Sequence, residues 1–149
     1  MFLVTGATGF IGSAVVRRLL ARHLKVRVLL RPSSDRSNIC GLDVEVVEGD
    51  LLCSASVRSA VKGCEGVFHV AADYRLWTPN SRDMFMVNVD GTRCIIEAAI
   101  EARVPKIIYT SSVAVLGNDQ NKPSDEETPV SYQEMIGTYK KSKFRAEEA

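Results

Sequence analysis

The sequence has no strong excess of charge, no long hydrophobic run and no paired cysteines. Its 19 Lys and Arg side chains are balanced by 18 Asp and Glu side chains, so the formal net charge is +1. This balance gives no electrostatic case for binding nucleic acid or an anionic membrane surface. Apolar runs such as Val26–Leu30 are far shorter than the ~20 residues of a membrane-spanning helix. We therefore expect no nucleic-acid partner and no membrane span.

Cysteine and histidine are too scattered to form a metal centre. None of the four cysteines belongs to a C-x-x-C pair, and His23 and His69 are isolated. We therefore expect reduced thiols and no metal ligands. The cysteines are Cys40, Cys53, Cys64 and Cys94.

The first residues already have the pattern of a strand, without a charged leader, which favours a cytoplasmic location.

Short apolar runs alternate with helical patterns, which is typical of a parallel sheet with helices on both faces. Right-handed crossovers place five such strands in the order 3-2-1-4-5, a doubly wound α/β Rossmann fold. In the first helix we expect Ile11, Val15, Leu19 and Leu20 to face the sheet. The expected strands are residues 2–5, 26–30, 44–47, 67–70 and 106–111, and the expected helices are residues 11–22, 54–61, 87–102 and 131 to the end.

With 149 residues the chain is long enough for one domain with a core and too short for two. Segment 117–129 is rich in turn-forming residues and is expected to be a surface loop. The last helix keeps its charged amphipathic pattern up to Ala149 without a terminating residue. We therefore expect a truncated chain that ends before the last strands of the fold and before a substrate domain.

A glycine-rich turn joins the first expected strand to the first expected helix. Gly6, Gly9 and Gly12 have the spacing G-x-x-G-x-x-G, and no lysine follows as in a phosphate loop. Glycine lets the backbone approach a pyrophosphate, whose charge is bound by the N–H groups of the helix N-terminus. This predicts that residues 1–149 form one NAD(P)-binding Rossmann domain, with the turn further lined by Thr8, Phe10 and Ile11.

The end of the second strand bears on which dinucleotide binds. Arg31 stands where an NAD-specific site carries an acid, and a guanidinium makes charge-assisted contacts to a phosphate. Ser33, Ser34 or Arg36 would assist it. This favours NADP, with NAD as the alternative because Asp35 is only four residues further on.

Asp50 and Leu51 follow the third strand, where the adenine of a dinucleotide would lie. The carboxylate of Asp50 would accept a hydrogen bond from the adenine amino group, and Leu51 would pack on the ring. The alternative is that Asp50 caps the following helix.

A phenol and an ammonium lie four residues apart near the end of the chain. Tyr139 and Lys143 share one helix face, where the ammonium would stabilise a phenolate and make the tyrosine a useful proton-transfer group. Lys143 would also hold the nicotinamide ribose. Ser111 and Ser112 end the fifth strand, where open α/β sheets place their sites, and would polarise a carbonyl.

Together these segments resemble the extended short-chain dehydrogenase/reductase superfamily, also called the NAD-dependent epimerase/dehydratase family. The resemblance extends over the whole chain, and segment 68–77 is closest to the dihydroflavonol-4-reductase-like branch, which includes the hopanoid-associated sugar epimerases. The motifs are the glycine turn, Gly49-Asp50-Leu51, Val67-Phe68-His69-Val70-Ala71-Ala72, Asn88-Val89-Asp90-Gly91-Thr92, Tyr109-Thr110-Ser111-Ser112 and Tyr139 through Lys143.

The resemblance implies a Ser-Tyr-Lys triad of Ser112, Tyr139 and Lys143. It also implies that the backbones of Ala71 and Ala72 line the nicotinamide, that Asn88 supports the site through a water, and that relatives form homodimers. Leu116 departs from the family pattern, since many sugar epimerases carry a tyrosine there. The family's carboxy-terminal substrate region is absent, so the chain alone is expected to lack one wall of the site.

Three functions follow from these features. The first is an NADPH-dependent oxidoreductase that reduces a small-molecule carbonyl, and the second is an NAD-dependent epimerase or dehydratase of a sugar-type substrate. The third, from another class, is a non-catalytic dinucleotide-binding module. The intact set of Ser112, Tyr139 and Lys143 favours the enzymes.

Overall fold

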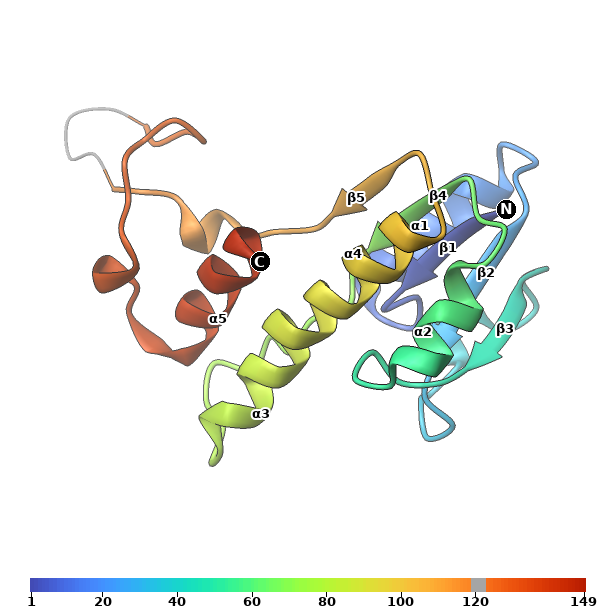
Figure 1. The fold of residues 1–149 in the computed structure, drawn as a ribbon, viewed down its shortest axis with the longest axis horizontal. Helices are drawn as coiled ribbons and strands as arrows, with labels where there is room; N and C mark the ends of the chain where they lie inside the picture. The colour runs from blue at the N-terminus through green and yellow to red at the C-terminus, as the bar shows by residue number, and fades with distance from the viewer. Residues whose placement is uncertain (119–122) are drawn as a thin grey trace.

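The computed structural model describes residues 1–118 and 123–149. Within these residues, five parallel strands form one sheet in the order β3-β2-β1-β4-β5 (Figure 1). This order confirms the doubly wound α/β fold expected from the sequence. The strands are β1 Phe2–Thr5, β2 Val26–Leu30, β3 Glu45–Glu48, β4 Gly66–His69 and β5 Ile107–Tyr109.

Helices connect the strands and cover both faces of the sheet (Figure 1). In the described segments, every helix is too short or too polar to cross a bilayer. The α-helices are α1 Phe10–Leu20, α2 Ser54–Val61, α3 Ser81–Phe85, α4 Gly91–Glu101 and α5 Gly137–Glu148. The 3-10 turns are η1 Ser37–Ile39, η3 Val113–Val115 and η4 Tyr132–Glu134, and the π-helical segment η2 Met86–Asp90 joins α3 to α4.

Neighbouring residues of the central strand β1 enter two hydrophobic cores, one on each face of the sheet. Leu3 packs in the core that includes α2 and α4, and Val4 packs in the core that includes α1. Both are fully buried, and burying a side chain of this size stabilises the fold by about 1.5–3 kcal/mol. Coverage of both faces explains why the strands appear as continuous apolar runs in the sequence.

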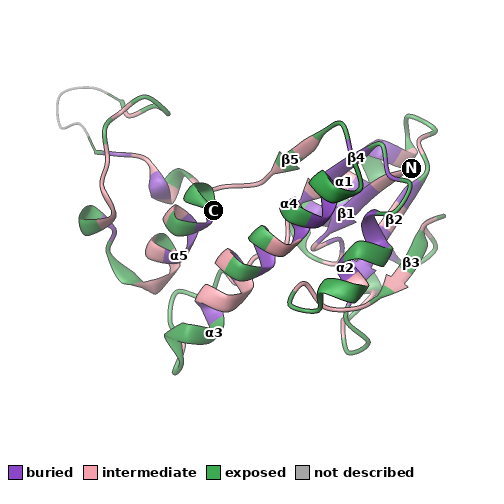
Figure 2. Ribbon diagram, in the orientation of Figure 1, coloured by how far each residue is buried: buried purple, intermediate pink, exposed green. Residues whose placement is uncertain are grey.

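Burial decreases from the centre of the sheet toward β5 (Figure 2). Three of the four residues of β1 are buried, whereas none of the three residues of β5 is, and Ile108 is 43% exposed. The chain leaves β5 through η3 and returns as α5, which packs against η2, α3 and η3 (Figure 1). This packing holds α5 beside the carboxyl end of β5.

Three of the four residues of the first helix that are predicted to face the sheet do so, since Leu19 is buried and Val15 and Leu20 are partly buried against the same core. Gly12, Val16 and Leu19 are buried, whereas Ile11 is 53% exposed. A Cβ atom on Gly12 would lie only 2.0 Å from the carbonyl oxygen of Gly6, so the two backbones are in direct contact. Gly12 thus faces the glycine turn, and its neighbour Ile11 is the one predicted residue that lies at the surface.

The two later helices begin at other residues than predicted. The helix expected at 87–102 starts earlier, because the side chain of Asn80 caps α3 by accepting the N–H of Arg82 at 3.1 Å. The helix expected from 131 starts at Gly137. Ser131 does begin a capping box, but only one 3-10 turn follows, since the backbone of Met135 is extended. Residues 119–122 of the expected loop lie outside the described residues.

Candidate functional site

The predicted site residues other than Tyr139 and Lys143 follow the carboxyl ends of the strands, which lie along one edge of the sheet. This edge is where open α/β sheets bind their ligands. The glycine turn follows β1, Arg31 follows β2, Asp50 follows β3, Ala71 follows β4, and Ser111 and Ser112 follow β5.

The glycine turn has the shape of a cradle for a pyrophosphate. Gly6 has a φ of 68°, and a Cβ atom there would lie 2.7 Å from the backbone nitrogen of Ala71. Gly9 donates its N–H to the Gly6 carbonyl oxygen at 3.0 Å and precedes α1 without a side-chain cap. The first N–H groups of α1 therefore lack a side-chain acceptor of their own and can bind an anion. The turn fits a dinucleotide phosphate in both shape and charge.

The other residues predicted for this turn lie on its rim. Phe10 is 90% exposed, and Ile11 is also exposed beside it. Thr8 is half-buried, and its carbonyl oxygen accepts a hydrogen bond of 2.8 Å from the Asn38 side chain. Arg17 in turn donates to the carbonyl oxygen of Asn38 at 2.7 Å. The rim is thus tied to the segment that follows β2.

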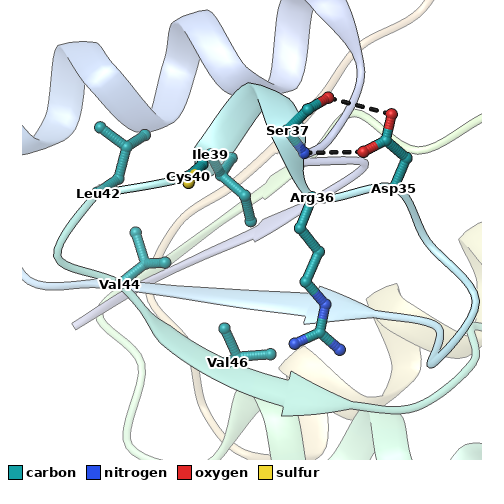
Figure 3. Close-up of a pocket in the computed structure, with 8 residues that line it drawn as sticks. All are labelled: Asp35, Arg36, Ser37, Ile39, Cys40, Leu42, Val44 and Val46. Carbon is teal, nitrogen blue, oxygen red and sulfur yellow. Dashed lines mark hydrogen bonds between the residues drawn. The ribbon is translucent and has the colours of Figure 1, made fainter.

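Asp35 and Arg36, which follow Arg31 in the sequence, form hydrogen bonds or ion pairs with other residues. Figure 3 shows Asp35 accepting two hydrogen bonds from Ser37, at the edge of a hollow of 440 Å³ between η1 and β3. Arg36 lines the same hollow and pairs with Glu48 at 2.5 Å. Arg31 is exposed, and its side chain forms no ion pair within the described part of the chain. Of the groups predicted to read a 2′-phosphate, Arg31 is therefore the unpaired cation.

Asp50 does not cap the helix that follows it, so the alternative considered for it is wrong. Its carboxylate accepts the N–H of Leu52 at 2.9 Å, and α2 begins after Cys53 without a side-chain cap. Leu51 packs beside α4, where a Cβ atom on Gly91 would lie 3.2 Å from the Leu51 Cβ. The half-buried Asp50 remains at the carboxyl edge of the sheet.

The segment after β4 is fastened by one buried side chain. Ala71 and Ala72 are half-buried and lead into Asp73, whose N–H donates to the Asn88 side chain at 2.7 Å. Asn88 also donates to the Asp73 carbonyl oxygen at 2.9 Å and to the Ser142 hydroxyl at 2.8 Å. Asn88 therefore joins this segment directly to α5.

Lys143 is buried on α5, and its ammonium reaches the end of β5. It donates to the Tyr109 hydroxyl at 2.5 Å and to the Thr110 carbonyl oxygen at 2.9 Å. Tyr139 lies one helical turn earlier and is half-buried. The structure thus brings Lys143 to the sheet edge, with a second tyrosine as its hydrogen-bond partner.

The two serines after β5 have different surroundings. The Ser112 hydroxyl accepts the N–H of Ala114 at 3.1 Å and caps η3. Among the described residues, the hydroxyl oxygen of Ser111 is the one buried side-chain oxygen or nitrogen without a hydrogen-bond partner. An unpaired buried hydroxyl is destabilising, and it fits a site that is completed by a ligand.

Burial shifts three titratable groups at this end of the sheet. It lowers the pKa of Lys143 from 10.5 to about 8, against a smaller raising effect of Glu147. It raises the pKa of Tyr109 to about 12 and lowers that of His69 to about 3, where the charge of Lys143 adds to the effect. Near neutral pH, Lys143 is therefore mostly charged, while Tyr109 and His69 are uncharged.

The sequence-based prediction missed the role of His69. Its ring is fully buried and stacks on the Tyr109 ring with 5.6 Å between centroids. One ring nitrogen lies 2.7 Å from the Thr5 hydroxyl and the other 2.9 Å from the Thr92 hydroxyl. The available signal was a histidine inside an otherwise apolar buried strand, which requires hydrogen-bond partners from neighbouring elements.

Known proteins resemble this chain in sequence and in fold. The model of the NAD dependent epimerase/dehydratase family matches residues 2–149. A protein of Synechocystis sp. with a provisional assignment as dihydroflavonol 4-reductase is 40% identical over 148 residues, which are 99% of this chain and 43% of the relative.

The solved structures that are similar over 99% of the chain include the following two. The crystal structure of gox2253 has 54% identity and a TM-score of 0.93, and the match covers 45% of that chain. A short-chain dehydrogenase/reductase superfamily protein from Agrobacterium tumefaciens, solved with bound NAD, has 34% identity, a TM-score of 0.80 and 43% coverage. The chain spans less than half the length of each of these relatives.

Proposed function

Because the chain belongs to the NAD dependent epimerase/dehydratase family, we propose that it forms the cofactor-binding part of an NADPH-dependent carbonyl reductase. One arrangement carries the proposal: the glycine cradle and the buried Lys143, one helical turn from Tyr139, lie at the same edge of one sheet. The name of the Synechocystis relative supports reduction as the reaction.

In this proposal the cofactor lies along the carboxyl edge of the sheet. The pyrophosphate binds the glycine turn and the N-terminus of α1, and the exposed guanidinium of Arg31 binds the 2′-phosphate. The adenine lies at Asp50 and Leu51, and the nicotinamide lies against the backbones of Ala71 and Ala72. The proposed cofactor-binding residues are Gly6, Thr8, Gly9, Phe10, Ile11, Gly12, Arg31, Asp50, Leu51, Ala71, Ala72, Tyr139 and Lys143.

NADPH, when bound, supplies the hydride that reduces a carbonyl carbon. Tyr139 donates its phenolic proton to the carbonyl oxygen, so that an alcohol forms and the cofactor is left oxidised. The Ser112 hydroxyl donates a hydrogen bond to the same oxygen and stabilises its developing negative charge. The ammonium of Lys143 stabilises the phenolate that Tyr139 becomes.

The hydrogen bonding of Lys143 leaves room for this role. An ammonium has three N–H donors, and Tyr109 and Thr110 take two of them. The third has no partner among the described residues, so it is available to a ribose hydroxyl or to Tyr139. Lys143 can therefore keep both contacts to β5 while it acts in the site.

An NAD-dependent sugar epimerase or dehydratase is the second candidate, favoured by the NAD bound to the Agrobacterium relative. In that case the cofactor stays on the protein and Tyr139 acts first as a base. Protein purified with tightly held NAD would favour this candidate, whereas rapid exchange of NADPH would favour the reductase. A non-catalytic dinucleotide-binding module would bind cofactor without turnover.

The test is Tyr139→Phe in the complete protein, with NADPH oxidation followed over a panel of carbonyl compounds. Loss of the phenolic proton should lower turnover by about 10²- to 10⁴-fold and spare NADPH binding. Tyr132→Phe is the matched control, since Tyr132 packs by its ring against Phe144. Turnover that survives in Tyr139→Phe would remove Tyr139 from the proposed role.

A further inference from the structure

His69 joins three elements of the fold through its buried ring. In the sheet, Thr5 of β1 and His69 of β4 are register partners, and His69 is in turn the partner of Tyr109 in β5. The His69 Nδ1 atom lies 2.7 Å from the Thr5 hydroxyl, and Nε2 lies 2.9 Å from the hydroxyl of Thr92 in α4. Both ring nitrogens are therefore occupied, and the orientation of the ring is fixed.

The neighbouring hydrogen bonds determine where the protons lie. The Thr92 hydroxyl donates its single proton to the Asn88 carbonyl oxygen at 2.6 Å, so toward His69 it must accept. His69 Nε2 therefore carries the proton, and in the neutral ring Nδ1 is the acceptor. The Thr5 hydroxyl then donates to Nδ1 and is left to accept the N–H of Ala71, which lies 3.2 Å away.

All of these hydrogen bonds run in one direction, from Ala71 through Thr5, His69 and Thr92 to Asn88. A protonated ring would break this order, because both nitrogens would donate and the Thr5 hydroxyl proton would lose its acceptor. The titratable groups that face the ring are Tyr109, which stacks on it, and Lys143 beyond Tyr109.

This row of hydrogen bonds ends at the two parts of the candidate site, the glycine turn and the segment that holds α5. Ala71 is the residue against which Gly6 is packed, where a Cβ atom would lie 2.7 Å from its nitrogen. Asn88 holds the segment after β4 and binds Ser142 on α5, the helix that carries Tyr139 and Lys143. Thus the hydrogen bonds connect Ala71, which packs on the glycine turn, to the backbone of Asn88, whose side chain binds α5.

We propose that His69, as the neutral ring protonated at Nε2, is a positioning residue of the site. It fixes the backbone of Ala71, against which the nicotinamide would lie, in contact with the glycine turn. It also holds η2 and thereby α5 in place. This assignment rests on the proposed function for its ligand. The side chain itself touches neither the cofactor nor the substrate.

The proton position is tested first, by ¹⁵N–¹H NMR of the histidine rings between about pH 6 and pH 8. The sequence has only two histidines, so the spectrum of His69→Gln assigns the His69 signals. The expected result is a neutral ring with the proton on Nε2 across this range. A proton on Nδ1, or a charged ring near pH 6, would overturn the proposal without any reference to cofactor binding.

The positioning role is tested by the dissociation constant of NADPH for two variants in the complete protein. A glutamine amide has one acceptor and one donor group, so His69→Gln can accept from Thr5 and donate to Thr92. We expect its affinity to remain within about threefold of the wild type, and His69→Phe, which keeps a ring but no polar atoms, to bind about tenfold or more weakly. Equal binding by a folded His69→Phe would contradict the proposal.

Two further variants separate positioning from a general loss of stability, and they serve as well if His69→Phe does not fold. Thr5→Val breaks the path on the side of the cofactor and should raise the KM for NADPH. Thr92→Val breaks it on the side of α5 and should lower kcat with little change in that KM. Identical effects of the two variants would indicate a merely structural role. If the wild type binds neither NADPH nor NADH, the proposed function fails, while the NMR result still decides the state of His69.

Discussion

The ammonium of Lys143 donates a hydrogen bond of 2.5 Å to the hydroxyl of Tyr109, which belongs to the neighbouring strand and not to its own helix. The same ammonium lies 4.2 Å from the centre of the Tyr109 ring. A buried cation held by a phenol and a carbonyl oxygen keeps its charge without a carboxylate partner. This contact places the charge of α5 at the carboxyl end of β5, where the proposed chemistry requires it.

Lys143 should give the stability of the protein a specific pH dependence. Its pKa is about 8 in the folded chain and 10.5 as the ordinary value, so between these values the unfolded chain binds more protons. The free energy of unfolding therefore rises with pH in this window, by up to roughly 1.4 kcal/mol per pH unit. Lys143→Met lacks this contribution, so urea unfolding of both proteins should diverge in favour of the wild type from about pH 8 upward.

The comparison of Lys143→Met with the wild type is best kept below about pH 10. The raised pKa of Tyr109 opposes stability above that value, because the unfolded chain then releases the phenolic proton more easily. Buried thiols contribute equally to both proteins and cancel in the difference. A difference in unfolding free energy that does not change with pH would mean that Lys143 is not buried as a cation.

Gly6 should be intolerant of a side chain for a steric reason beyond its backbone angle. Gly6 and Gly41 have similar positive φ angles of 68° and 73°, but a Cβ atom on Gly41 has no atom within 4 Å. Gly41→Ala should therefore cost about 1–2 kcal/mol of stability for the backbone alone. Gly6→Ala should cost about 1–3 kcal/mol more, because of the contact with Ala71, and should lose dinucleotide binding. Equal costs in denaturant unfolding would contradict the close contact.

Replacement by alanine should change a different property at Ser111 than at Ser112. Ser111→Ala removes a buried unpaired hydroxyl and should stabilise the cofactor-free protein by about 1 kcal/mol. Ser112→Ala removes the cap of η3 and, as the proposed oxyanion donor, should lower turnover by about 10²- to 10³-fold. Denaturation curves and initial rates check the two effects. A larger loss of turnover in Ser111→Ala would transfer the catalytic role to Ser111.

Elements that depend on local sequence were predicted well. The bounds of β1, β2 and α2 agree with the prediction, since each is a short patterned segment closed by a turn or a polar loop. The predicted start of the last helix at residue 131 was wrong. The capping box at Ser131 is a helix signal, but the buried, extended Met135 ends the helical backbone after one turn. Sequence pattern alone does not show that interruption, which depends on tertiary packing.

Contacts between distant elements could not be predicted. The polar row of Thr5, His69 and Tyr109 exists because these residues are register partners on three adjacent strands, and register is not visible in a single sequence. In the same way, the sequence places Arg36 near Arg31, but only the fold shows that Arg36 pairs with Glu48 of β3. The motif residues that follow the strands lie at the expected edge of the sheet, whereas their hydrogen-bond and ion-pair partners emerged only from the fold.

The most direct test is a calorimetric titration of the complete protein with NADPH and with NADH, repeated for Arg31→Ala and for the control Arg36→Ala. A charge-assisted contact to the 2′-phosphate predicts that the wild type binds NADPH about 10- to 100-fold more tightly than NADH. Arg31→Ala should abolish this preference, and Arg36→Ala, whose guanidinium is paired with Glu48, should retain it. Equal or tighter binding of NADH by the wild type, or an unchanged preference in Arg31→Ala, would contradict the proposed NADPH-dependent function.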